Sequence, residues 1–267
     1  MLIRADILRD LFGVAPKGVL HVGAHEAEEE PAYRELGWGP VVWVEMLPDK
    51  AEALRRRFAD DPLNSVIEAA AWGESGIERD LYESDNKQSS SLYAPQTHLV
   101  AHPEVRFERR GRIVTRRLDE VLEPRFHPEF LNLDVQGAEL EVMIGLGARL
   151  TAVKWCYLEV NLDALYAQIP LRDEVDAFLR ARGFTRIVEA IHERFGWGDA
   201  LYANGQAFPP EALFRHKLAG AKLRTPSLSP LDLCGPELVA YLKFGAPPPD
   251  AGAPSLLPGD LAEVRRI

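Results

Sequence analysis

The sequence predicts an α/β protein built around a parallel β-sheet. Short β-branched runs alternate with amphipathic segments from the N-terminus to about Gly205, which is the pattern of successive strand–helix–strand units. Two of these runs lead directly into helix-start signals, a small-residue turn after Val22 and a proline at Pro48. The composition is 46% hydrophobic and 27% charged, an ordinary mix for a globular chain that excludes disordered and collagen-like proteins.

Prolines and glycines mark the ends of the predicted elements. Pro48 suits the first turn of a helix, and Gly37 and Gly183 suit the position after one. We expect helices at 3–12, 27–36, 48–58, 138–144 and 173–182. We expect strands at 18–22, 41–44, 66–71, 130–133 and 154–160, and a closing antiparallel pair at 184–189 and 199–203. Residues 72–117 show no long helical pattern, so we expect a loop-rich stretch with strand pieces at 78–82 and 112–117.

The composition changes after Gly205, where prolines become frequent. We expect residues 1–205 to form one domain and residues 206–267 to form a proline-rich C-terminal extension. Short helices are expected near 210–221 and 235–243, and the end of the extension is expected to be mobile.

The charge and the cysteines limit the partners and the compartment. Lysine and arginine number 31 against 41 aspartates and glutamates, so the formal net charge is −10. Phosphate contacts need clustered basic residues, so we expect neither a nucleic-acid partner nor an anionic membrane. No apolar run is long enough to span a bilayer, and the N-terminus lacks the pattern of a signal peptide. Cys156 and Cys234 suit a reducing compartment, so the cytoplasm is the expected location.

The first predicted strand ends in a small-residue turn. Gly23 and Ala24 would let a ligand approach the backbone beside a helix start. The fingerprint GxGxxG of nicotinamide-dependent oxidoreductases is absent, and carboxylates follow His25 in its place. These carboxylates would repel a pyrophosphate but tolerate a cationic ligand. The alternative is an ordinary turn, because acidic residues favour helix N-termini in any case.

Two further strand ends carry carboxylates that would face the same crevice. Glu45 lies 22 positions after Gly23, the place from which an acidic residue binds both hydroxyls of a ribose. Asp134 follows a buried-looking strand and precedes another Gly-Ala turn. Ligands of open α/β sheets bind outside the carboxyl ends of the strands. The alternative for each carboxylate is a solvated strand end.

An ordered set of segments then resembles a known family. HVGAHEAEE, WVEMLP, IEAAAWGESG, QSSSL, RRLDEVL, LNLDVQGAELEVMIGL, YLEVN and GWGDALY occur in sequence. Over roughly residues 18–204 the chain is similar to the FkbM-type S-adenosylmethionine-dependent methyltransferases. The resemblance implies a class I, Rossmann-like fold: a seven-stranded, mostly parallel sheet with its last strand antiparallel and helices on both faces. It also implies O-methylation of a hydroxyl on a small molecule, a sugar or a secondary metabolite.

The same resemblance implies the donor site and shows where the chain departs from the family pattern. The residues expected to bind S-adenosylmethionine are Gly23, Ala24, His25, Glu28, Glu45, Ala70, Ser90, Ser91 and Asp134. The departures from the usual residues are His21, His25, Ala27 and Gln136.

A hydroxyl acceptor gains from a general base, typically ~10²–10⁴-fold. Asp134, Glu159 and Asn161 are the expected catalytic residues. A carboxylate beside a sulfonium becomes a weaker base, so Glu159 is favoured as the base and Asp134 as the group that positions the donor. Asn161 would bind the acceptor.

Other interpretations of the chain stay open at this stage. His98 and His102 have the spacing of a metal-binding pair, but no metal is expected. A non-catalytic interaction protein of the same fold and a nicotinamide-dependent oxidoreductase remain as alternatives. The extension is expected to cover the acceptor side of the crevice or to form a homodimer contact.

Overall fold

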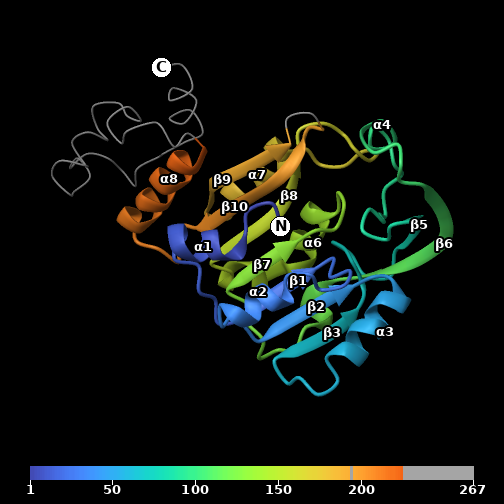
Figure 1. Cartoon of the computed structure of the whole chain (residues 1–267), viewed down its shortest axis with the longest axis horizontal. Helices are drawn as coiled ribbons and strands as arrows, with labels where there is room; N and C mark the ends of the chain where they lie inside the picture. Colours follow the sequence, from blue (N-terminus) through green and yellow to red (C-terminus); the bar gives the residue numbers. More distant parts are fainter. Residues whose placement is uncertain (193–194, 225–267) are drawn as a thin grey trace.

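The computed structural model describes residues 1–192 and 195–224. Its main sheet has seven strands in the order β3-β2-β1-β7-β8-β10-β9 (Figure 1). The strands are parallel except β10, which pairs antiparallel with both β8 and β9. This order and this single reversed strand are those expected for the class I methyltransferase fold.

The strands fall close to the predicted ranges. β1 (Val19–Val22), β2 (Val41–Glu45) and β7 (Phe130–Leu133) lie at the centre with β8 (Trp155–Asn161). β3 (Asn64–Glu68) forms one edge, and β9 (Phe184–His192) with β10 (Trp197–Asn204) completes the other side. Every residue of the central strands is buried, as expected for parallel strands that are covered on both faces.

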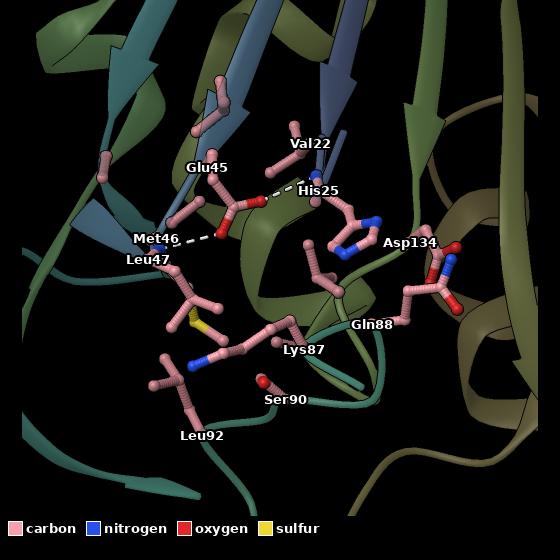
Figure 2. Close-up of a pocket in the computed structure, with 16 residues that line it drawn as sticks. Val22, His25, Glu45, Met46, Leu47, Lys87, Gln88, Ser90, Leu92 and Asp134 are labelled. Carbon is pink, nitrogen blue, oxygen red and sulfur yellow. Dashed lines mark hydrogen bonds between the residues drawn. The ribbon is translucent and has the colours of Figure 1, made fainter. Parts of the chain in front are cut away.

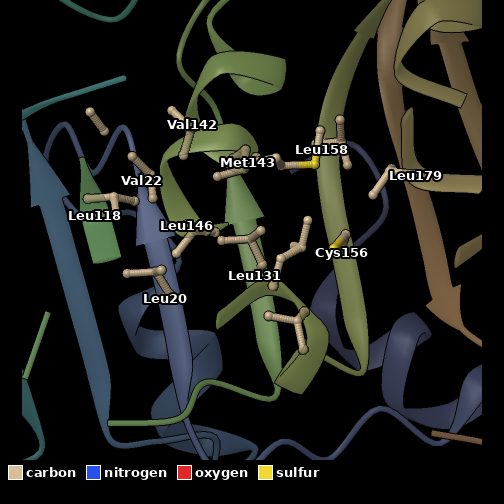
Figure 3. Close-up of a cluster of buried hydrophobic side chains, with 14 of the residues drawn as sticks. Leu20, Val22, Leu118, Leu131, Val142, Met143, Leu146, Cys156, Leu158 and Leu179 are labelled. Atoms are coloured by element: carbon tan, nitrogen blue, oxygen red, sulfur yellow. The ribbon is translucent and has the colours of Figure 1, made fainter. Parts of the chain in front are cut away.

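Helices cover both faces of the sheet because side chains alternate along each strand. On one face, Leu20, Leu131 and Leu158 pack against α6 (Glu139–Leu146), together with α5 (Leu118–Val121), η1 (Gly147–Ala152) and α7 (Arg172–Arg180) (Figure 3). On the other face, Trp43 and Phe130 pack against α1 (Ala5–Phe12), α2 (Glu30–Glu35) and α3 (Pro48–Arg57). The result is a three-layer α/β/α arrangement.

Beside the main sheet lies a smaller one. β4 (Ala70–Ala71), β6 (Phe107–Arg116) and β5 (Glu78–Ser84) form a three-stranded sheet in that order. The segment that links β5 to β6 contains the short helix α4 (His98–Ala101). Figure 1 shows β5, β6 and α4 past the carboxyl ends of β1 and β2. The predicted strand 66–71 is therefore two strands: its first part belongs to the main sheet and Ala70–Ala71 to the small one.

Two further predictions differ from the structure at element ends. The helix expected at 27–36 begins only at Glu30, because His25 and Ala27 adopt positive φ angles of 45° and 54°. The strand pieces expected at 78–82 and 112–117 are both longer in the structure, since β5 and β6 pair along most of their length.

α8 (Pro210–Arg224) forms where a short helix was expected near 210–221. It packs against β9, where a Cβ on Gly220 would lie 2.2 Å from the carbonyl oxygen of Ile187. Phe214 on this helix is buried. The first part of the proposed extension thus contacts the main domain, and the helix expected near 235–243 lies outside the described residues.

Candidate functional site

Four carboxylates form a row across the main sheet near the carboxyl ends of its parallel strands, which we call the acidic row: Glu45, Asp134, Glu159 and Asp199. The strand register explains their alignment. Glu159 lies opposite Asp199 in the β8–β10 pair, and Leu133 lies opposite Leu158 in the β7–β8 pair, which puts Asp134 level with Glu159. His21 lies opposite both Trp43 and Asn132. Two residues further along each of these three strands, Gly23 is therefore level with Glu45 and Asp134, and the side chains at these positions point to the same face as those of the paired residues.

Gly23 is the position at which a side chain would clash with the neighbouring strand end. Its φ is 85°, and a Cβ there would lie 1.8 Å from the carbonyl oxygen of Asp134. No side chain fits at that distance. The ends of β1 and β7 therefore approach each other closely because the residue after β1 is glycine.

Next to this turn is a pocket with about 520 Å³ of free space, including the part open to solvent. Figure 2 shows the His25 ring between Glu45 and Asp134, with the segment of Lys87, Gln88 and Ser90 across the pocket from β1 and β2. The remaining lining is mostly apolar and comprises Val22, Gly23, Val44, Met46, Leu47, Ala69, Ala71, Leu92, Val135 and Ala138. Apolar walls around a few convergent polar groups are typical of a cofactor site.

Glu45 is held rigidly at the end of β2. It is only 6% exposed, and its two carboxylate oxygens accept hydrogen bonds of 2.8 Å from the amides of His25 and Leu47. Burial raises the pKa of Glu45 although these amides oppose the shift. Each carboxylate oxygen can accept a second hydrogen bond, so two hydroxyl groups could bind here together.

His25 has one satisfied ring nitrogen. Nδ1 lies 2.6 Å from Glu28 Oε1, whereas Nε2 is buried and has no hydrogen-bond partner among the described residues. A buried polar atom without a partner is costly, and this one belongs to a residue that lines the pocket. Gln88 also donates to Glu28, at 3.2 Å, so Glu28 joins the turn after β1 to the segment across the pocket.

Asp134 and Glu159 are linked through Gln136. The amide nitrogen Nε2 of Gln136 lies 2.8 Å from Asp134 Oδ1 and 3.1 Å from Glu159 Oε2. Asn161 Nδ2 donates to Glu159 Oε1 at 3.3 Å, and Asn161 Oδ1 has no partner in the described part of the chain. Asp134 is open to solvent, whereas Glu159 is 7% exposed. The two carboxylates therefore differ in access although they share one donor.

Burial raises the pKa values along this edge. Asp134 as a residue is exposed, but the surrounding protein desolvates its carboxyl and raises its pKa to about 6, and the charge of Asp199 adds to the shift. The pKa of Glu159 rises well above its usual value, mainly because of burial and secondly because of the negative charge of Asp134. At neutral pH, Asp134 is therefore mainly ionised, and Glu159 holds its proton more strongly.

The structure brings most of the predicted donor-site residues together. Gly23, His25, Glu45, Ser90 and Asp134 line the pocket. Ala24 and Ala70 are buried beside it without lining it.

Ser91 and two of the three predicted catalytic residues, Glu159 and Asn161, lie outside the pocket lining. The Ser91 hydroxyl donates to the carbonyl oxygen of Gln136 at 2.7 Å, so it contacts the turn after β7. Glu159 lies next to Asp134 in the acidic row and Asn161 contacts Glu159, but neither Glu159 nor Asn161 lines the pocket.

Several lining residues were not predicted. Met46 and Leu47 directly follow Glu45, and Val135 and Ala138 flank the turn after Asp134. Their positions beside predicted residues were a usable signal. Lys87 and Leu92 reach the pocket only because the β5–β6 connection returns to it, and no local pattern encodes that return.

The structure gives two findings on metals and membranes. Across residues 1–192 and 195–224, no group of three or more histidine, cysteine or acidic side chains could hold a metal ion, although the rings of His98 and His102 lie 4.9 Å apart. None of the helices in the described part of the chain is long and apolar enough to cross a bilayer.

Comparison with known proteins identifies the family. A family model described as the methyltransferase FkbM domain matches residues 21–186, more than half of the chain. A relative, 2-O-methyltransferase NoeI of Sinorhizobium fredii (strain NBRC 101917 / NGR234), is 34% identical over 172 residues, which cover 59% of this chain and 67% of that protein.

Solved structures show weaker likenesses. Sp1610 of Streptococcus pneumoniae, a candidate tRNA (m1A22) methyltransferase, is 14% identical with a TM-score of 0.44 over 97% of this chain and 96% of that one. The 1,6-didemethyltoxoflavin-N1-methyltransferase of Burkholderia thailandensis, with bound S-adenosylhomocysteine, is 14% identical. Its TM-score is 0.42, and the match covers 74% of this chain and 75% of that one. At these scores the fold assignment depends on the strand order and not on the neighbours.

Proposed function

Because the chain belongs to the FkbM methyltransferase family and is an S-adenosylmethionine-dependent O-methyltransferase, we propose that its acceptor is a hydroxyl of a small molecule, a sugar or a secondary metabolite. The observation that carries this proposal is the acidic row beside the donor pocket. Carboxylates accept hydrogen bonds from hydroxyl groups, and they repel the phosphates of a nucleic acid. The relative named for transfer to a 2-O position supports a hydroxyl acceptor.

The pocket fits S-adenosylmethionine in the chemistry of its groups. The Glu45 carboxylate, fixed by two backbone amides, would accept hydrogen bonds from the two ribose hydroxyls. The apolar walls at Leu47, Leu92 and Val135 would contact the adenine. Gly23 lines the pocket, and the absence of a side chain there lets the turn after β1 approach the Asp134 carbonyl oxygen closely.

The chain's own part in the reaction is orientation and proton transfer. A bound donor supplies a methyl group on a cationic sulfur, and the oxygen–methyl bond forms as the sulfur–methyl bond breaks. The acceptor hydroxyl loses its proton in the same reaction. We now favour Asp134 as the proton acceptor, because it faces the crevice and is mainly ionised at neutral pH. Burial of Glu159 makes it the weaker candidate, in contrast to our expectation from sequence.

The test combines binding with transfer. Calorimetry should show micromolar binding of S-adenosylhomocysteine and none of NAD. Radiolabelled donor should then transfer label to members of a panel of glycosides and hydroxylated metabolites. Transfer of label only to RNA or protein in a parallel panel would contradict the proposed acceptor class. Donor binding without transfer to any acceptor would favour the non-catalytic alternative.

A further inference from the structure

Gln136 is a neutral side chain between two carboxylates of the acidic row. Its single amide nitrogen lies within hydrogen-bond distance of Asp134 Oδ1 and Glu159 Oε2, at 2.8 and 3.1 Å. A primary amide has two N–H donors, so the group can give one hydrogen bond to each carboxylate. No other single side chain in the described residues is shown to contact both carboxylates.

The surroundings of Gln136 determine which end of the amide faces the carboxylates. The Tyr166 hydroxyl lies 2.7 Å from the amide oxygen Oε1. This contact keeps Oε1 directed away from the acidic row. The Ser91 hydroxyl holds the main-chain carbonyl of the same residue. The nitrogen end is therefore the one directed at Asp134 and Glu159.

The backbone of Gln136 is also unusual. Its φ is 52°, in the left-handed region, which is unfavourable for a residue other than glycine. Gly137 follows with a φ of 101°. A strained conformation that is held by Ser91 and Tyr166 from two sides indicates that the placement of this side chain matters.

We propose that Gln136 is a positioning residue for proton transfer: it fixes Asp134 and Glu159 relative to each other and stabilises the ionised form of the pair. This inference rests on the proposed function, in which Asp134 accepts the hydroxyl proton. A glutamate at the same place would add a third acidic group. An apolar side chain would leave both carboxylates without the shared donor. Both changes disfavour ionisation of the pair.

The other charged groups around the pair make this donor important, because they are mostly acidic. Coulombic interactions reach Asp134 and Glu159 from Asp199 of β10, Glu139 of α6, Glu29 before α2 and the amino group of Met1. Three of these four groups are carboxylates that oppose further negative charge. The Gln136 amide is thus a contact that favours the ionised state of Asp134.

The experiment compares Gln136→Glu and Gln136→Met with the unmodified chain. In both Gln136 variants the acid limb of the kcat/KM profile should move to higher pH by about one unit or more. At pH values below the apparent pKa, kcat/KM should therefore be about tenfold lower than in the unmodified chain. Donor affinity should change less than about twofold, since Gln136 does not line the donor pocket. Carboxyl-carbon NMR titration of the free protein should show the same upward shift for Asp134 without any turnover.

Matched variants separate this role from a general effect of the backbone. Gln168 is exposed and also has a positive φ, 63°, so Gln168→Glu and Gln168→Met should leave both the profile and the titration unchanged. Tyr166→Phe should give a smaller shift in the same direction as the Gln136 variants, and it remains informative if those variants do not fold.

Two results would overturn the proposal or separate it from the proposed function. An unmoved pH limb together with an unmoved titration in the Gln136 variants and Tyr166→Phe overturns the positioning role. A shifted titration in a protein that methylates no hydroxyl leaves the positioning role intact and refutes the proposed function.

Discussion

At the scale of single residues, Glu45 has two tasks that depend on the same atoms. Its carboxylate fixes the turn after β1 through His25 and the start of α3 through Leu47. The same oxygens are the ones proposed to bind the donor's ribose. A residue that both shapes a pocket and contacts its ligand has to be tested with a readout for each task.

We predict that Glu45→Gln weakens the binding of S-adenosylhomocysteine by about 1.5–3 kcal/mol, the usual worth of a charged hydrogen bond. One of the two backbone amides would then face an N–H₂ group, so a lower melting temperature is also expected. Glu68 pairs with Glu45 in the register of β3 and β2 but is exposed, so Glu68→Gln should bind normally. If calorimetry shows that Glu45→Gln binds S-adenosylhomocysteine as tightly as the unmodified chain, Glu45 does not belong to the donor site.

Asp134 gives the second prediction at this scale. Activity requires its ionised form, so kcat/KM should rise with pH through an apparent pKa near 6, the value to which burial raises this carboxyl. Asp134→Asn should lower kcat by ~10² or more with little change in donor affinity. Asp173→Asn, at an exposed position, is the control.

A different result for Asp134→Asn would change its assigned role. If donor affinity and rate fall together, Asp134 positions the donor. If both stay at the level of the unmodified chain, it is a structural strand end.

The sequence predicted some of these residues and missed the contacts between them. Glu45 was predictable because its distance from Gly23 is a property of the chain alone. The link from Asp134 through Gln136 to Glu159 needs two parallel strands in register, and Tyr166 and Ser91 reach it from segments far apart in sequence. Such contacts depend on tertiary structure, which no local spacing encodes.

At the scale of elements, the close approach of the turns after β1 and β7 depends on Gly23. Sequence predicted the central strands well because short, mostly hydrophobic runs mark buried parallel strands. The start of α2 and the split between β3 and β4 were missed. The first depends on the left-handed backbone at Ala27, and the second on pairing with β6.

We predict that Gly23→Ala is much more destabilising than Gly76→Ala. The two glycines have φ angles of 85° and 82°, so a side chain costs both positions a similar backbone strain of about 1–2 kcal/mol. At Gly23 the added Cβ would also clash with the Asp134 carbonyl, whereas at Gly76 nothing lies within 4 Å. Chemical unfolding measures both. Equal losses of stability would show that the two turns can separate.

At the scale of the whole molecule, buried acidic side chains lie together near the carboxyl ends of the parallel strands, and their burial lowers the stability of the fold. Glu45, Glu139 and Glu159 are each less than a tenth exposed, and burial raises the pKa of all three. An upward shift means that the folded chain binds more protons than the unfolded chain at intermediate pH. These groups therefore make the fold less stable as the pH rises.

Glu139 allows this cost to be measured at a carboxyl for which no catalytic role is proposed. It lies at the start of α6, where Oε1 accepts hydrogen bonds from the amides of Val135 and Gly137. Burial raises its pKa from 4.5 to about 7, and the charge of Asp134 adds to the shift. The protonated carboxyl therefore contributes fully to the free energy of unfolding below the pKa of Glu139 in the unfolded chain. This contribution is lost as the pH rises through the pKa of Glu139 in the folded chain.

We predict that Glu139→Gln reduces the loss of stability between pH 5 and pH 8 by about 1–3 kcal/mol relative to the unmodified chain. Glutamine keeps an oxygen acceptor for both amides and has no charge to bury. Titrating groups that do not interact with Glu139 contribute equally to both proteins, so the difference between the two pH dependences reports this carboxyl together with its interactions with Asp134 and Glu159. Glu74, which is exposed, provides the control Glu74→Gln. Denaturant unfolding at both pH values gives the free energies, and parallel pH dependences for Glu139→Gln and the unmodified chain would show that this carboxylate is already solvated in the folded protein.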